Sequence, residues 1–186
     1  MGTIAVIDTE TTWKDEVMSI GVVTTDDKEF LPAEKRYYVL TPFKNHGGMY
    51  SNVLYADGIV PDIEGSRQSV MNDLLNFLLS RNISDIFAYN ALFDFHHLPE
   101  LRGFFWYDIM KLAAYRQFNK KIPVSADTYS TGRLKRGYGV EEIYRMLSGD
   151  RYYREIHNAL TDAVDELDIM RMLGIEIGRY TAAKIT

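Results

Sequence analysis

Two carboxylates, Asp8 and Glu10, stand at the end of the first apolar run of the sequence. Side chains alternate along a strand, so both carboxylates are expected on one side, in line with Ile4 and Val6. Two negative charges at this spacing repel each other, and a cation between them would remove the repulsion. By itself Asp-x-Glu is more often a turn or a helix cap, so a metal site requires further carboxylates.

A further carboxylate is Asp94, within Tyr89-Asn90-Ala91-Leu92-Phe93-Asp94. It follows an apolar run and falls in the first turn of a helix that Asn90 is expected to open. The alternative is structural: Asp94 complements the helix dipole and Asn90 is only a cap. His96 and His97 are adjacent and would point about 100° apart on a helix, so we interpret them as surface or packing residues.

The third segment is His157-Asn158-Ala159-Leu160-Thr161-Asp162. On one continuous helix, residues five apart diverge by about 140°, so the helix is expected to begin after His157. Asn158 is a suitable N-cap, which leaves the imidazole on the approach segment and Asp162 on the first turn. Asp165, Glu166 and Asp168 then continue as a solvated face.

Together, the three segments supply four carboxylates and one imidazole. Oxygen ligands without any cysteine suit Mg²⁺ or Mn²⁺. Two such ions about 4 Å apart stabilise both oxygens of a phosphoryl displacement, and a nearby imidazole can take the proton of the attacking water. This set of residues therefore predicts phosphodiester hydrolysis.

The composition is that of one globular domain spanning residues 1–186, with 46% apolar and 25% charged residues. A disordered or fibrous chain is excluded. No apolar run approaches the roughly 20 residues of a membrane span, and the first 31 residues lack a secretory leader pattern, so we expect a cytoplasmic protein without membrane contact. Nothing in the sequence indicates an oligomeric state.

The elements expected to position these residues form an α/β fold. Three strands at the start are joined by connections too short for helical crossovers, which predicts an antiparallel meander. Later strands alternate with helices and should be parallel, completing a mixed five-stranded sheet flanked by helices. The expected strands are 3–10, 16–25, 34–41, 84–89 and 103–107. The expected helices are one that Ser66 caps, followed by 90–101, 109–118, 131–137, 140–148 and 158–173.

Two segments have no clear place in this scheme. Residues 42–65 are too long for an ordinary connection, and Asn45-His46-Gly47-Gly48 suits either a flexible flap or an irregular surface excursion. Residues 111–139 are locally basic in a chain of net charge −5, and could guide a single strand or form a solvated face. The basic residues are Lys111, Arg116, Lys120, Lys121, Arg133, Lys135 and Arg136, against Asp127 alone.

The three motifs together resemble the DEDDh family of 3′-to-5′ exonucleases, which includes the epsilon proofreading subunit of bacterial DNA polymerase III. Val6-Ile7-Asp8-Thr9-Glu10-Thr11-Thr12 is similar to the first family motif, and the segments ending at Asp94 and Asp162 are similar to the second and third. The resemblance implies a ribonuclease H-like fold. It also implies release of nucleoside 5′-monophosphates from single-stranded 3′ ends, with DNA favoured and RNA trimming as the alternative.

The resemblance also implies roles for individual residues. Asp8, Glu10 and Asp162 would ligate one Mg²⁺ or Mn²⁺ ion, Asp8 would bridge to a second ion that Asp94 completes, and His157 would be the general base. The residues implied for substrate binding are Thr9, Thr11, Asn90 and Phe93. The expected partner is a DNA or RNA 3′ end, within a polymerase or repair complex.

Three positions depart from the family pattern. Trp13 replaces a glycine, so either the loop bends differently or its ring stacks on a base. Tyr89 replaces a common histidine, and Asp57 stands where a histidine helps to hold the nucleotide. These changes bear on affinity rather than hydrolysis. Two further readings remain: a catalytically silent module that binds nucleic-acid ends, and a purely structural metal site.

Overall fold

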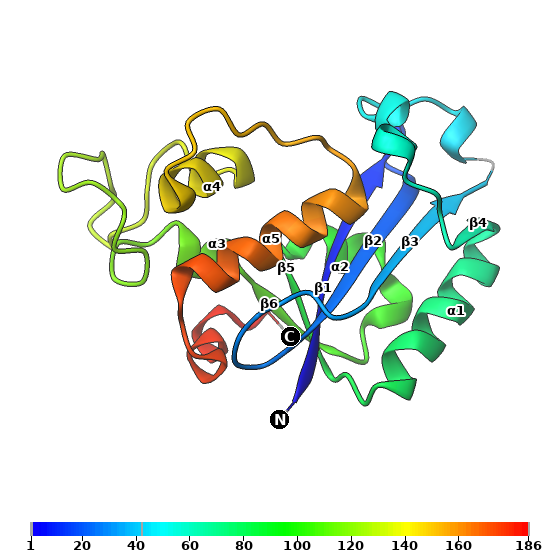
Figure 1. The fold of residues 1–186 in the computed structure, drawn as a ribbon, viewed down its shortest axis with the longest axis horizontal. Helices are drawn as coiled ribbons and strands as arrows, with labels where there is room; N and C mark the ends of the chain where they lie inside the picture. Colours follow the sequence, from blue (N-terminus) through cyan, green and yellow to red (C-terminus); the bar gives the residue numbers. More distant parts are fainter. Residues whose placement is uncertain (1, 42, 186) are drawn as a thin grey trace.

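The computed structural model describes residues 2–41 and 43–185 (Figure 1). Its central layer is a six-stranded sheet in the order β4-β3-β2-β1-β5-β6. The strands are β1 (Thr3–Thr11), β2 (Val17–Asp26), β3 (Lys35–Leu40), β4 (Ile63–Gly65), β5 (Asp85–Ala88) and β6 (Phe105–Asp108). The first three strands pair antiparallel, whereas β4, β5 and β6 are parallel to the strands beside them. The predicted meander followed by parallel units is confirmed.

The sheet has one strand more than predicted, because β4 pairs with β3 at the edge. A strand of three residues that begins two positions after Pro61 is too short to show a period in the sequence. The connection before it contains three 3₁₀ helices, η1 (Phe43–Asn45), η2 (Ser51–Val53) and η3 (Ala56–Gly58). Pro42, where the predicted segment begins, lies outside the described residues.

The helices are α1 (Arg67–Ser80), α2 (Leu92–His97), α3 (Met110–Ala113), α4 (Val140–Ser148) and α5 (Ala159–Leu173), with 3₁₀ helices η4 (Pro99–Leu101) and η5 (Ile177–Ala183). Ser66 caps α1 as predicted, since its side chain accepts the N–H of Ser69 at 3.2 Å. Helices α2 and α3 are shorter than predicted.

The helix predicted at 131–137 is absent from the structure. Gly132 and Gly137 both adopt positive φ, at 83° and 65°, which an α-helix does not accommodate. Leu134 lies in an isolated β-bridge with Thr128 instead. This part of the basic segment is therefore an irregular loop, which projects beside α4 (Figure 1).

Alternation along β1 divides the core between the two faces of the sheet. Ile4 and Val6 pack against α5, which crosses one face, whereas Ala5 and Ile7 pack in the core that contains α1 (Figure 1). Asp8 and Glu10 continue the row of Ile4 and Val6. The carboxylates therefore lie on the face that α5 covers.

A glycine lets α5 approach this face closely. Gly21 pairs with Asp8 across β1 and β2, and a Cβ at position 21 would lie only 2.0 Å from the carbonyl oxygen of Ala159. Any larger residue would push away the first turn of α5. Position 21 thus sets how near Asp162 comes to Asp8.

Within the described part of the chain, no helix is both long and apolar enough to span a membrane.

Candidate active site

The carboxylates predicted from three separate segments meet at the carboxyl edge of the sheet. Asp8 and Glu10 come from β1, Asp94 from the first turn of α2, and Asp162 from the first turn of α5. Potential ligand atoms of Glu10, His157 and Asp162 all lie within 4.8 Å of one another. Residues more than 140 positions apart in the sequence thus form one side-chain cluster.

Burial raises the pKa values of all four carboxyl groups, and repulsion from other carboxylates adds to the shift at Asp8, Glu10 and Asp162. Burial raises the pKa of Asp94 to about 7, although a 2.7 Å hydrogen bond from Thr9 Oγ1 opposes the shift. Burial, followed by repulsion from Glu155, raises Glu10 to a pKa of about 8 and Asp162 to a pKa of about 9. The pKa of Asp8 also lies well above its usual value, because it is buried beside other carboxylates. When these carboxyl groups are ionised, their negative charges repel one another.

Two oxygens in this cluster are shielded from solvent and lack a hydrogen-bond partner among the described residues. They are Asp8 Oδ2 and Asp162 Oδ1. A buried carboxylate oxygen without a donor is costly unless a cation satisfies it. The residues present therefore fit a hard divalent cation, whose preferred ligands are carboxylate oxygens.

The sequence prediction missed two acidic residues beside the cluster. Glu166 was expected on a solvated face, but it is 2% exposed and its Oε2 accepts the backbone N–H of Tyr89 at 3.0 Å. Burial and the charge of Asp94 raise its pKa. Its position four residues after Asp162, on the same side of α5, was the available signal. Glu155 is half-buried, and burial raises its pKa to about 7.

His157 lies just outside α5, as the spacing predicts. Asn158 caps the helix, its Oδ1 accepting the N–H groups of Leu160 and Thr161 at 3.1 and 3.4 Å. His157 itself has a left-handed backbone with φ of 61°, and its ring stacks on Tyr50 at a centroid distance of 3.9 Å. Burial lowers its pKa, which favours the neutral imidazole near pH 7.

The segment that carries Tyr50 is tied to the start of α5 and to β3. The amide Nδ2 of Asn158 donates to the carbonyls of Val53 and Leu54, at 2.9 and 3.3 Å. Tyr37 Oη also donates to the Leu54 carbonyl, at 2.8 Å. Of the two interpretations of this segment, these contacts favour an anchored excursion over a free flap.

A cavity of about 410 Å³ adjoins Glu10, and three of the four residues predicted to bind substrate line it. Thr9, Thr11 and Phe93 line it, together with Glu10, Thr12, Trp13, Met49 and Tyr50. The Trp13 side chain is 67% exposed. An exposed aromatic ring at the wall of a cavity is suited to stacking on a nucleobase.

Asn90 takes a different place from the one predicted. The residue before α2 is Ala91, and no side chain caps the helix, so Asn90 is not its N-cap. Asn90 has a left-handed backbone with φ of 57° and lines another cavity instead. Asp57, which departs from the family pattern, is exposed and does not line the cavity at Thr9.

The basic segment is partly committed to its own structure. The Arg116 guanidinium donates to the carbonyls of Pro123, Val124 and Ala126, at 3.1 to 3.2 Å. Lys135 pairs with Asp127 at 3.0 Å. Lys120 Nζ donates to the Gln117 carbonyl at 2.8 Å. These three cations are therefore engaged within the segment itself.

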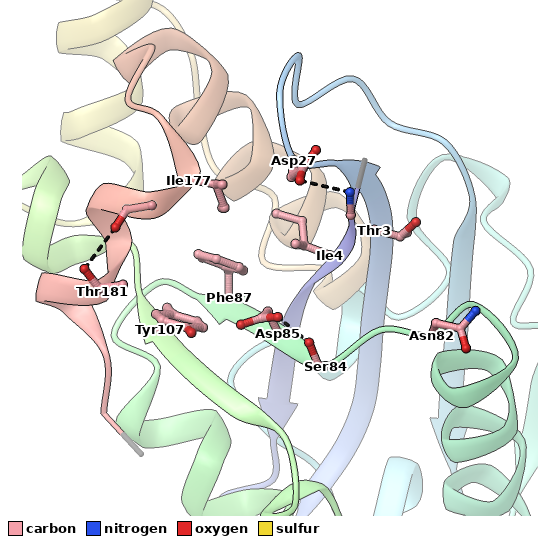
Figure 2. Close-up of a pocket in the computed structure, with 12 residues that line it drawn as sticks. Thr3, Ile4, Asp27, Asn82, Ser84, Asp85, Phe87, Tyr107, Ile177 and Thr181 are labelled. Atoms are coloured by element: carbon pink, nitrogen blue, oxygen red, sulfur yellow. Dashed lines mark hydrogen bonds between the residues drawn. The ribbon is translucent and has the colours of Figure 1, made fainter.

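A further cavity, of about 280 Å³, opens at the opposite edge of the sheet (Figure 2). Thr3 and Ile4 at the start of β1 line it, with Asp85 at the start of β5 and Thr181 of η5. None of the residues of the carboxylate cluster lines it. The predicted chemistry and this cavity therefore lie at different ends of the strands.

The fold is that of the 3′-exonucleases, including members of the DEDDh family. The nuclease domain of 3′hExo, a DEDDh family member solved with rAMP, superimposes with a TM-score of 0.61 over 91% of this chain and 90% of that one, at 17% identity. Exonuclease X in complex with 5′ overhanging duplex DNA superimposes with a TM-score of 0.57 over 96% of this chain and 99% of that one, at 20% identity.

A 3′-exonuclease solved with a histone mRNA stem-loop gives a TM-score of 0.64 at 17% identity. The match covers 92% of this chain but 63% of that one, so this chain spans less than two thirds of its length. No protein-family model and no curated protein matches the sequence. At these identities, the likeness establishes the ribonuclease H-like fold that the motifs implied.

Proposed function

We propose that this chain is a metal-dependent 3′-to-5′ exonuclease that hydrolyses phosphodiester bonds at single-stranded ends and releases nucleoside 5′-monophosphates. The observation that carries the proposal is the convergence of Asp8, Glu10, Asp94, Asp162 and His157 at one edge of the sheet. The fold shared with 3′-exonucleases supports it.

The four carboxylates would hold Mg²⁺ or Mn²⁺. Two such ions, when bound, supply electrostatic stabilisation to the attacking and departing oxygens of the phosphodiester. Asp8 Oδ2 and Asp162 Oδ1, which lack donors, are the oxygens best suited to ligation. Thr9 keeps Asp94 in place through its 2.7 Å hydrogen bond.

His157 would accept the proton of the attacking water. Its imidazole lies beside Glu10 and Asp162 and is held against Tyr50, and burial lowers its pKa, which keeps it neutral and basic. Thr9, Thr11 and Phe93 would hold the terminal nucleotide in the adjoining cavity. His97 positions Phe93, since the two rings lie 4.2 Å apart and His97 Nδ1 is 2.8 Å from the Phe93 carbonyl.

We propose DNA as the substrate, cleaved in the cytoplasm, with RNA of the same sequence as the competing candidate. Exonuclease X, which this chain matches over 99% of the length of Exonuclease X, was solved with DNA. Binding of a free 3′ end is the partner interaction that the site requires.

The test uses oligonucleotides labelled at the 3′ or the 5′ end, incubated with Mg²⁺ or Mn²⁺. Immediate release of labelled mononucleotide from the 3′-labelled strand, with gradual shortening of the 5′-labelled strand, is the expected result. Glu10→Gln should abolish release, whereas Glu29→Gln, an exposed carboxylate in the β2–β3 connection, is the matched control. Equal release by both variants would refute the site.

A further inference from the structure

A second cavity, of about 350 Å³, opens beside the carboxylate cluster. It is lined by Tyr89, Asn90, Met110, Arg133, Tyr138 and Gly139. Its wall at Tyr89 also faces the cluster, because the Tyr89 N–H donates to Glu166 Oε2. The cavity at Thr9 lies at the end of β1, whereas this one lies at the ends of the neighbouring strands β5 and β6.

Arg133 is the charged residue that lines this cavity, and its N–H donors bind no other residue in the described part of the chain. The half-buried guanidinium lies over the Tyr138 ring, at 4.8 Å from the centroid. Among the described residues, its side chain has no ion pair and no hydrogen bond. Stacking on an aromatic face uses only the plane of the group, so the N–H donors at its edge remain available.

The backbone holds Arg133 in this place. Arg133 forms an isolated β-bridge with Tyr115, and its carbonyl accepts the Tyr129 N–H at 2.8 Å. Tyr89 Oη donates to the Tyr138 carbonyl, which fixes the ring under the guanidinium to the wall of the cavity. The neighbouring Arg116 differs, since its Nη2 already donates to three carbonyls.

A half-buried cation without an anionic partner is suited to an anionic ligand. The planar guanidinium presents paired donors that match two oxygens of a phosphate. We propose that Arg133 binds a backbone phosphate of the substrate strand, upstream of the terminal nucleotide held at Thr9 and Thr11. This proposal rests on the proposed function, and it implies that the strand crosses the carboxylates between the two cavities.

The test measures binding without hydrolysis. Fluorescein-labelled DNA and RNA strands of one sequence, from the dinucleotide upward, are titrated with protein by fluorescence anisotropy in Ca²⁺. For the longer strands, Arg133→Gln should raise Kd about tenfold, as expected for the loss of one charge-assisted phosphate contact. The slope of log Kd against log salt should fall by about 0.7, which corresponds to one phosphate of a single strand.

Two variants complete the design. Arg133→Lys retains the positive charge but not the paired donors, so it should keep the wild-type salt slope while recovering only part of the affinity. A salt slope reduced as far as in Arg133→Gln would assign the effect to packing on Tyr138 and overturn the proposal. Lys135→Gln, which removes a nearby cation already paired with Asp127, should leave Kd unchanged.

The dinucleotide separates this proposal from the proposed function. It has no phosphate upstream of the scissile one, so Arg133→Gln should leave its Kd unchanged. The ratio of its Kd to the Kd of the longer strands should therefore fall about tenfold in this variant. Unchanged ratios and salt slopes, or wild-type protein that binds neither strand, would overturn the proposal. A wild-type protein that binds strands through Arg133 but hydrolyses none would refute only the exonuclease activity.

Discussion

Replacing Gly21 by alanine should disable the site by moving the start of α5. The added Cβ would lie 2.0 Å from the Ala159 carbonyl oxygen and 2.3 Å from the Leu160 nitrogen. Both are backbone atoms, so no side chain can rotate away, and the first turn of α5 must retreat. Overpacking of this kind costs about 1–3 kcal/mol of the free energy of unfolding.

The effect on activity should exceed the effect on stability. A displacement of about 1 Å can lower a rate on the order of 10²-fold, and the same turn carries Asp162. Urea unfolding gives the stability, and release of 3′-terminal mononucleotide in Mn²⁺ gives the rate. Gly103→Ala is the matched control, because nothing lies within 4 Å of a Cβ at that position. Gly21→Ala protein that matches Gly103→Ala in both measurements would refute the close-packing argument.

Four further predictions concern the cluster and its cavity. Asp162→Asn should abolish turnover yet raise the Tm of the metal-free protein, because it removes the free-energy cost of burying a carboxyl group that is ionised in the unfolded chain; an unchanged or lower Tm by calorimetry would contradict this. The folded-state pKa values of Asp94, Glu10 and Asp162, about 7, 8 and 9, exceed the unfolded values near 4. The stability that these carboxyl groups contribute is therefore fully present below about pH 4, and it is lost as the pH rises through their folded-state pKa values of about 7 to 9. The Tm measured in EDTA should fall as the pH rises from about 4 to 9, and bound Mn²⁺ should make this fall smaller. His157→Ala should lower kcat by about 10²–10⁴-fold and remove the acidic limb of its pH dependence, the fall in rate caused by protonation of the imidazole, which rate measurements across pH would reveal. Trp13→Ala should raise KM about tenfold by loss of base stacking, whereas Trp13→Phe should largely retain it; equal KM values would exclude stacking.

Five of the six strands and the positions of the motif residues were readable from the sequence, because each depends on a local pattern. The apolar run ending at Asp8 predicts β1, and the divergence of His157 and Asp162 on one helix predicts that α5 begins after His157. Both predictions are confirmed. They required only the periods of a strand and a helix.

The features that were missed depend on contacts between distant segments. Glu166 looks like a surface residue until α5 is known to pack on β1 and β2, where the Tyr89 N–H that follows β5 meets it. The close contact at Gly21 likewise exists only in the assembled fold. The helix predicted at 131–137 is wrong, because Gly132 and Gly137, both at positive φ, determine the backbone there.

The contacts of Asn158 restrict which residue can occupy that position. Its Oδ1 accepts two N–H groups of the first helical turn while its Nδ2 donates to two carbonyls of the preceding excursion. Aspartate offers only acceptors, and the single hydroxyl of serine or threonine cannot span both directions. The other common N-cap residues therefore cannot replace Asn158, because position 158 requires a carboxamide. A chain without one would keep α5 but lose the hydrogen bonds that hold the preceding excursion, and with it Tyr50, beside the His157 imidazole.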